Sequence, residues 1–93
     1  MIEIDRKQLE QWTEENKEFV LIDVRESHEH RAYNIGGLLI PLSEISSHYD
    51  RFDTDLPVVI YCQRGIRSQI AIQRLQSRFP KVKFYNLTQG VKE

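Results

Sequence analysis

Cys62 is the only cysteine in the 93-residue sequence, and it lies where a reactive thiolate can form. It follows the apolar run 57–61 and opens the loop 62–68, after which an amphipathic helical pattern begins. A tight loop between a strand and a helix surrounds a side chain with backbone N–H groups and with the positive end of the helix dipole. Arg64 and Arg67 add full positive charges to the same loop. Because such surroundings lower the pKa of a thiol and the thiolate is the nucleophilic form, we predict a catalytic cysteine rather than a buried structural one.

This loop resembles the active-site loop of the rhodanese family of sulfurtransferases, whose motif is Cys-x-x-Gly-x-Arg. Cys62, Gly65 and Arg67 match the motif position by position. Ser68 matches the small hydroxyl residue that often follows the motif. The resemblance implies an α/β fold of the rhodanese-like type and a sulfurtransferase activity that depends on Cys62.

A second group of matches lies upstream of the loop. The segment 21–25, Leu-Ile-Asp-Val-Arg, resembles the family's strand that ends in Asp-Val-Arg, and Glu29 stands in the acidic position that follows. Residues 35–37 and Pro41 fall where the family carries a His-Ile-x-Gly-Ala segment and a proline. Asn34 departs from the family, which commonly has histidine at that position. The order and spacing of these segments strengthen the resemblance, which covers most of the chain.

The resemblance implies a reaction in two steps, in which Cys62 carries a persulfide. The Cys62 thiolate attacks the outer sulfur of a small anionic donor such as thiosulfate, and a thiol, cyanide or a sulfur-carrier protein then removes that sulfur. Backbone N–H groups of residues 63–68 hold the negative charge, and Arg67 binds the donor's sulfonate oxygens in a fork. Arg64 either steers anions at the entrance or is an ordinary solvated residue. The mechanism calls for no cofactor.

Asp23 and Arg25 are predicted to support the site rather than to react. Asp23 follows the apolar run 19–22 as Cys62 follows 57–61, and ligands of open α/β sheets sit outside the carboxyl ends of the strands. A carboxylate at such an end can hold a neighbouring loop or an arginine in place. The candidate site therefore comprises the nucleophile Cys62, the anion-binding residues Gln63, Arg64, Gly65, Ile66, Arg67 and Ser68, and the supporting residues Asp23 and Arg25.

Two other functions use parts of the same pattern. Cysteine phosphatases also pair a thiolate with an arginine, but they resemble Cys-x5-Arg, and the shorter Cys-x4-Arg loop from Cys62 to Arg67 suits one sulfur atom better than a phosphate. Rhodanese-like domains also serve as non-catalytic docking or regulatory modules, whose members usually lack the cysteine. The histidines do not indicate a metal site. His28, His30 and His48 lack cysteine or carboxylate partners in metal-ligand order, and the first two lie in a polar run that predicts a solvated helix face.

Composition indicates a single globular domain over residues 1–93. Hydrophobic residues make up 40% and charged residues 29%, and the formal net charge is -1, so neither nucleic acid nor a membrane is indicated as a partner. The N-terminus lacks the order of a signal peptide and a lone cysteine cannot form an internal disulfide, which favours the cytoplasm. In the family, a turn like 88–90 is followed by an aromatic residue and a closing helix. The sequence here is compatible with a short lineage or with a domain excised from a longer protein.

Hydrophobic patterns predict strands that alternate with helices. Asp5 and Gln8 form a capping-box pattern, and Ser27 is expected to cap the second helix. Strands are predicted at 2–4, 19–22, 38–40, 58–61 and 83–87, and helices at 5–15, 27–31, 42–49 and 69–79. The buried stripe of the last helix is predicted to consist of Ile66, Ile70, Ala71 and Leu75. This alternation indicates an α/β fold with a central, mostly parallel sheet of four to five strands and helices on both faces.

Overall fold

Strands and helices alternate along the chain, as the hydrophobic pattern predicts. The computed structural model describes residues 1–91, and the last two positions of the predicted domain, 92 and 93, lie outside the described residues. Asp5 caps the first helix as predicted, because its Oδ1 accepts the Gln8 N–H at 2.7 Å and Gln8 Oε1 accepts the Asp5 N–H at 3.0 Å. The elements are β1 (Ile2–Ile4), α1 (Arg6–Glu14), β2 (Val20–Asp23), α2 (Ser27–Ala32), β3 (Leu38–Leu39), the 3₁₀ segment η1 (Leu42–Phe52), β4 (Val58–Tyr61), α3 (Ile66–Arg78) and β5 (Phe84–Leu87).

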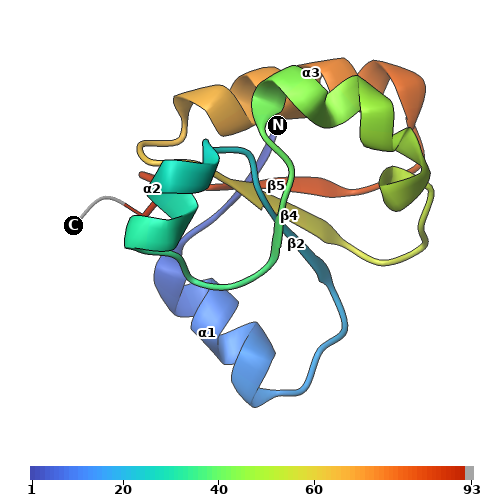
Figure 1. Ribbon diagram of the computed structural model, residues 1–93. Coiled ribbons are helices and arrows are strands. Elements are labelled where there is room, and N and C mark those ends of the chain that lie inside the picture. The colour runs from blue at the N-terminus through green and yellow to red at the C-terminus, as the bar shows by residue number, and fades with distance from the viewer. Residues whose placement is uncertain (92–93) are drawn as a thin grey trace.

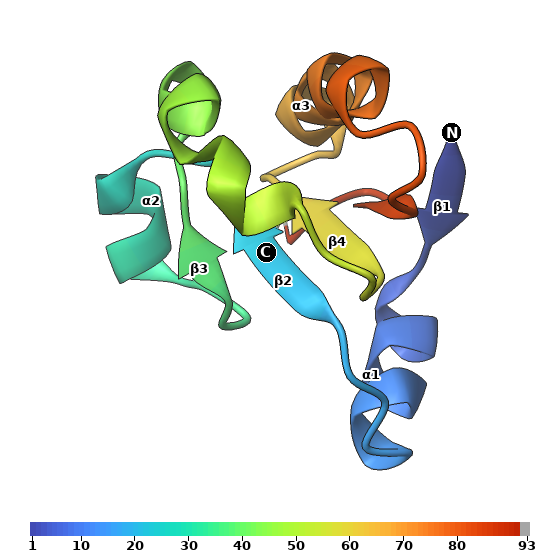
Figure 2. The same ribbon diagram turned by 90° about the vertical axis from the view of Figure 1, so that its right-hand side faces the viewer.

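The five strands form one sheet in the order β1-β5-β4-β2-β3, and every neighbouring pair runs parallel. This confirms the predicted α/β class, with a sheet that is entirely rather than mostly parallel. Figure 1 shows α3 and α1 on opposite sides of the strands. Figure 2 shows that the green η1 lies on the same side as α3. Since parallel strands need long crossover connections, the helices join the strands and cover both faces of the sheet.

β4 is the middle strand of the sheet, and its four residues are fully buried. Val58 and Ile60 pack in the core beneath α3 and η1, whereas Val59 and Tyr61 pack in the core beneath α1. Burial on both faces explains why this strand is apolar throughout. The central position also determines where Cys62 lies, because Cys62 directly follows the strand.

The inner face of α3 differs from the predicted one. Ile66 and Ile70 are 65% and 37% exposed, so their predicted place in the core is wrong. The helix begins at Ile66 rather than at residue 69, and its buried residues follow the i, i+3, i+4, i+7 spacing of one helix face. These buried residues are Ser68, Ala71, Ile72 and Leu75. The rotation of the helix about its axis, rather than hydrophobicity, therefore decides which side chains face the sheet. It also turns the Ser68 side chain inward.

The start of α2 also differs from the prediction, because Glu26 rather than Ser27 is its N-cap residue. The backbone N–H of Glu26 donates to Oε1 of Glu29 at 3.0 Å. The Glu29 carboxylate thus closes the first turn of α2, and it faces the candidate site from there.

Candidate active site

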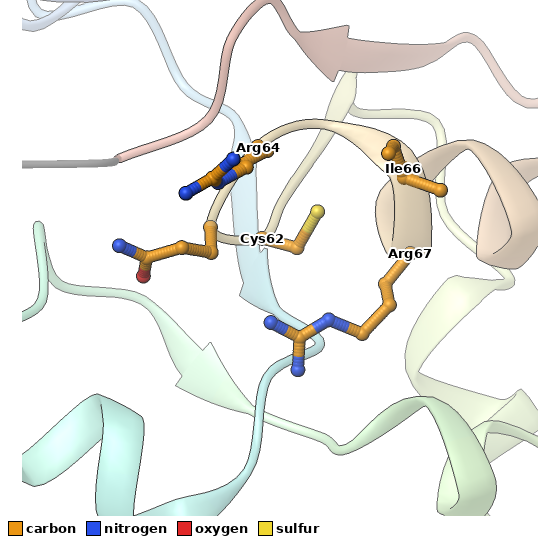
Figure 3. A pocket seen from close by; sticks show the side chains of 5 residues that line it. Cys62, Arg64, Ile66 and Arg67 are labelled. Carbon is orange, nitrogen blue, oxygen red and sulfur yellow. The ribbon is translucent and has the colours of Figure 1, made fainter.

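The predicted site residues come together at the carboxyl edge of the sheet. β2 ends at Asp23 and β4 ends at Tyr61, and these two residues are register partners in neighbouring strands. Ligands of open parallel sheets bind at this edge. A depression of about 370 Å³ opens there, and Figure 3 shows the side chains that line it: Cys62, Gln63, Arg64, Ile66 and Arg67.

The loop that follows β4 curls around the cysteine sulfur. Sγ of Cys62 accepts the Gly65 N–H at 3.1 Å and the Ser68 N–H at 3.3 Å. Gly65 is the N-cap of α3 and has a φ of 89°, a left-handed conformation that glycine adopts without steric cost. This turn directs N–H groups and the positive end of α3 toward the sulfur. Figure 3 shows the sulfur within the curve of the loop.

The pKa of the Cys62 thiol lies below its ordinary value, although the residue is only 1% exposed. Burial raises this pKa, because it disfavours the charged thiolate. Hydrogen bonds from the Ser68 side chain and from the backbone N–H groups of Ser68, Arg64 and Gly65 lower the pKa and outweigh burial. The loop therefore favours the nucleophilic form of the sulfur.

Asn86 on β5 supports the loop, although the sequence analysis did not single it out. Its Nδ2 donates to the carbonyl oxygen of Gly65 at 3.3 Å, and its Oδ1 accepts a hydrogen bond from Ser68 Oγ. Both side chains are buried. The available signal was a polar residue in the middle of an otherwise apolar strand, because a buried amide needs hydrogen-bond partners.

A second support comes from residues that follow β5. The Val91 N–H donates to the carbonyl oxygen of Cys62 at 3.1 Å. Gly90 lies against the same carbonyl oxygen, and a Cβ at Gly90 would also come within 2.6 Å of the Gln63 carbonyl carbon. Glycine at this position therefore lets two stretches of backbone approach closely.

The two arginines of the loop have different surroundings. Nη1 and Nη2 of Arg67 donate to Oε1 and Oε2 of Glu29 at 2.7 and 2.8 Å, a two-pronged ion pair between α3 and α2. Hydrogen bonding by Arg67 lowers the pKa of Glu29 to about 2, so Glu29 is ionised at neutral pH. Arg64 is exposed. Thus the guanidinium of Arg67, which is predicted to bind the donor's sulfonate oxygens, forms its two-pronged contact with Glu29. Arg67 also lines the depression and retains N–H groups that Glu29 does not use.

Asp23 and Arg25 form a buried ion pair, with 2.9 Å between Oδ2 and Nη2. Arg25 Nη1 donates to Gln63 Oε1 at 3.1 Å, which joins β2 to the active-site loop. Nδ1 of His30 lies 2.8 Å from Oδ2 of Asp23, so the predicted solvated helix face is wrong for His30, whereas His28 is exposed. Burial raises the pKa of Asp23, but the hydrogen bonds from Arg25 and His30 lower it below its ordinary value.

Among residues 1–91, no group of three or more His, Cys, Asp or Glu side chains is arranged to hold a metal ion. The helices of this described part of the chain are too short or too polar to cross a membrane.

Comparison with curated proteins relates the chain to longer proteins. It is 36% identical over 80 residues to the "Adenylyltransferase and sulfurtransferase MOCS3" of Drosophila ananassae, a match that covers 77% of this chain and 18% of that protein. It is 40% identical over 74 residues to the "Uncharacterized protein YqhL" of Bacillus subtilis (strain 168), with 78% and 58% covered. The chain therefore spans less than two thirds of the length of either relative.

Solved structures share the fold over nearly the whole chain. The rhodanese-like domain protein from Staphylococcus aureus superposes with a TM-score of 0.87 and 25% identity, covering 97% of this chain and 87% of that one. The human single-domain sulfurtransferase TSTD1 superposes with a TM-score of 0.68 and 22% identity, covering 95% and 91%. Residues 5–93 match the family model described as "Rhodanese-like domain". The chain belongs to the rhodanese-like domain family.

Proposed function

We propose that this chain is a sulfurtransferase in which Cys62 carries a sulfane sulfur as a persulfide. The observation that carries the proposal is the environment of Sγ, which accepts N–H groups of Gly65 and Ser68 at 3.1 and 3.3 Å beside an open depression. A lowered thiol pKa agrees with a nucleophilic role. Membership of the rhodanese-like family, with a relative named as a sulfurtransferase, supports the same conclusion.

In the first step, the Cys62 thiolate attacks the outer sulfur of an anionic donor such as thiosulfate. A bond forms between Sγ and that sulfur while the S–S bond of the donor breaks, and sulfite leaves with the electron pair. The persulfide then bears its negative charge on the outer sulfur. The N–H groups that turn toward the cysteine stabilise this charge, as an oxyanion hole stabilises oxygen.

In the second step, a thiophilic acceptor attacks the outer sulfur and restores the thiolate. Cyanide would leave as thiocyanate, and a thiolate, free or on a sulfur-carrier protein, would leave as a persulfide. Splitting one transfer into two displacements is the advantage of covalent catalysis. The cytoplasm is the proposed compartment, because the mechanism needs a reduced thiol.

Arg67 is the proposed contact for the sulfonate oxygens of the donor. It lines the depression next to Cys62, and Glu29 fixes the direction of its guanidinium through two short hydrogen bonds. The N–H groups that Glu29 leaves unused are available to an anion. Arg64, which is exposed at the same depression, is proposed to attract anions through its charge alone.

Intact mass spectrometry after treatment with thiosulfate tests the proposal. The unaltered protein should gain one sulfur atom, and cyanide should remove it with release of thiocyanate. Cys62→Ser should fold normally, because the change in volume is small, but should gain no sulfur, since a serine hydroxyl at neutral pH lacks the ionisation of a thiol.

Two outcomes would contradict the assignment. Failure of a reduced, folded protein to gain sulfur would indicate a non-catalytic docking module. Efficient hydrolysis of an aryl phosphate by the unaltered protein would instead favour a cysteine phosphatase. We expect that hydrolysis to be negligible, because the Cys-x4-Arg loop is one residue shorter than the phosphatase loop.

A further inference from the structure

The hydroxyl of Ser68 is a further polar neighbour of the Cys62 sulfur, with Oγ 3.4 Å from Sγ. The same hydroxyl donates to Oδ1 of Asn86. Cys62, Ser68 and Asn86 thus form a row that runs from the active-site loop through the first turn of α3 to β5. None of the three residues is more than 1% exposed. Hydrogen bonds within this row are therefore shielded from water and depend on one another.

The orientation of the Asn86 amide follows from its second contact. Its NH₂ group faces the carbonyl oxygen of Gly65 at 3.3 Å, where only a donor is favourable. A flipped amide would place two acceptor oxygens against each other. The amide oxygen therefore faces Ser68, and it can only accept.

The Ser68 hydroxyl has a single hydrogen, and Asn86 takes it in this arrangement. Only lone pairs of Oγ then face the sulfur, which suits a thiol that donates its S–H. The hydrogen bond by which the Ser68 side chain lowers the pKa of Cys62 therefore forms only when the hydroxyl donates to the thiolate instead of to Asn86. On ionisation, the hydroxyl has to turn toward Sγ and leave Oδ1 of Asn86 without its donor. In the structure of residues 1–91, every buried side-chain nitrogen or oxygen has a hydrogen-bond partner, Asn86 Oδ1 included, so this loss would create an exception.

The charged groups around the sulfur act separately from this hydroxyl. Arg67 of α3 and Arg64 of the loop line the same depression, and Glu29 of α2 pairs with Arg67. On the side of β2, the Asp23–Arg25 ion pair joins the loop through a glutamine side chain. These charges act on a thiolate whichever way the hydroxyl points. The direction of the hydroxyl is therefore an additional, independent control.

We propose that Asn86 is a positioning residue that controls the protonation of Cys62 through the direction of the Ser68 hydroxyl. In the resting protein, Asn86 Oδ1 holds the hydroxyl hydrogen and so favours the thiol. Ionisation releases the S–H proton to solvent and turns the hydroxyl to the sulfur. When a persulfide forms, the charge moves to the outer sulfur and the hydroxyl returns to Asn86. This last step rests on the proposed function, whereas the earlier steps concern the free thiol alone.

Asn86→Leu and Ser68→Ala should shift the pKa of Cys62 in opposite directions. Without the amide oxygen, the hydroxyl is free to donate to the thiolate, so the pKa falls; without the hydroxyl, the pKa rises. The rate of Cys62 alkylation by iodoacetamide, followed against pH, measures this pKa. For one hydrogen bond gained or lost, alkylation at neutral pH should rise roughly 2- to 10-fold in Asn86→Leu and fall by a similar factor in Ser68→Ala.

The double variant separates this role from simple support of the loop. If Asn86 acts through the hydroxyl, Asn86→Leu should leave the pKa unchanged in a Ser68→Ala background. Asn86→Ala removes the same oxygen without adding bulk, and it should also lower the pKa should the leucine variant fail to fold.

A higher pKa in Asn86→Leu or Asn86→Ala would mean that Asn86 only keeps the loop in place, and this would overturn the proposal. An unchanged pKa in Ser68→Ala would overturn it as well, because the hydroxyl would then not reach the thiolate. Alkylation uses no sulfur donor. Absence of sulfur transfer would therefore refute the proposed function without altering this result.

Discussion

Arg64 and Arg67 carry the same charge, but they can act on a ligand in different ways. Arg67 is held by two hydrogen bonds to Glu29, which raise its pKa further, whereas Arg64 is exposed. An exposed arginine attracts an anion through its charge, which a lysine also supplies. A guanidinium of fixed direction adds planar, two-pronged geometry, which a lysine lacks.

Arg67→Lys is therefore expected to lower sulfurtransferase activity more than Arg64→Lys does. Loss of one charge-assisted hydrogen bond is worth about 1.5–3 kcal/mol, so Arg67→Lys should reduce kcat/KM for thiosulfate roughly 10- to 100-fold. Arg64→Lys keeps the charge and should change little at low salt. Steady-state kinetics of both variants over a series of salt concentrations provide the measurement. Equal losses would mean that the loop is positive overall and has no dedicated donor-binding arginine.

At the scale of the elements, the position of the active-site loop depends on close contact with the turn after β5. Gly90 makes this contact possible, because a Cβ there would meet the Cys62 carbonyl oxygen and lie 2.6 Å from Gln63 backbone atoms. Gly36 also has a positive φ, but a Cβ at Gly36 would meet no atom within 4 Å. Substitution of Gly36 therefore tests backbone strain alone, whereas substitution of Gly90 tests backbone strain together with a steric clash.

Gly90→Ala should destabilise the protein more than the matched variant Gly36→Ala. A residue with a Cβ in the left-handed region costs about 1–2 kcal/mol, which both variants incur. Overpacking against backbone should add about 1–3 kcal/mol in Gly90→Ala and displace the Cys62 loop, so its sulfur transfer should fall as well. Urea unfolding compares the stabilities. Similar free energies of unfolding for the two variants would show that the turn can move away from the loop without cost.

The elements themselves could be predicted because their signals are local. The apolar strand 58–61, the capping box of Asp5 and the motif from Cys62 to Arg67 are each contained in a few consecutive residues. Ile66 was misplaced because hydrophobicity does not reveal the phase in which a helix meets a sheet.

Contacts between distant elements could not be predicted in the same way. Asn86 reaches Ser68 only because β5 lies next to β4, and strand order is not encoded in any short segment. His30 faces Asp23, and Glu29 faces Arg67, because α2 packs beside the carboxyl edge of the sheet. Such pairs follow from the tertiary fold, so the sequence marks the nucleophile and its loop but not the partners that Asn86, His30 and Glu29 provide.

At the scale of the whole molecule, the buried and half-buried charges gather at the edge of the sheet that holds the cysteine. The Asp23–Arg25 and Glu29–Arg67 pairs connect β2, α2 and α3 there. Both carboxylates have pKa values below their ordinary ones, and that of Glu29 is about 2. These two ion pairs therefore contribute to the stability of the folded protein and also hold the residues of the candidate site in place.

This coupling predicts that acid weakens the fold. A carboxylate whose pKa is lower in the folded state stabilises the protein above its unfolded pKa and loses that contribution as the pH falls. For Glu29 the loss should occur between pH 4.5 and about 2. Because the Arg67 side chain is 34% exposed, solvent and salt should reduce the size of this loss of stability. Free energies of unfolding in urea at neutral and acidic pH measure it.

Glu29→Gln should be less stable than the unaltered protein at neutral pH and should lose less stability on acidification. Glu10→Gln, which changes an exposed glutamate of α1, is the matched control and should leave the acid-dependent loss unchanged. Identical pH profiles for Glu29→Gln and the unaltered protein would contradict an energetic role for the ion pair with Arg67.

The strand order also determines when the site can be completed during synthesis. Of the five strands of the sheet, β1 is made first, but its neighbour in the sheet is β5, which is made last. The same late segment supplies Asn86, Gly90 and Val91 to the loop around Cys62. On the ribosome, the thiol therefore emerges well before the residues that enclose it. A nascent chain should pass through a period in which Cys62 is open to oxidation, and this period ends when the sheet closes.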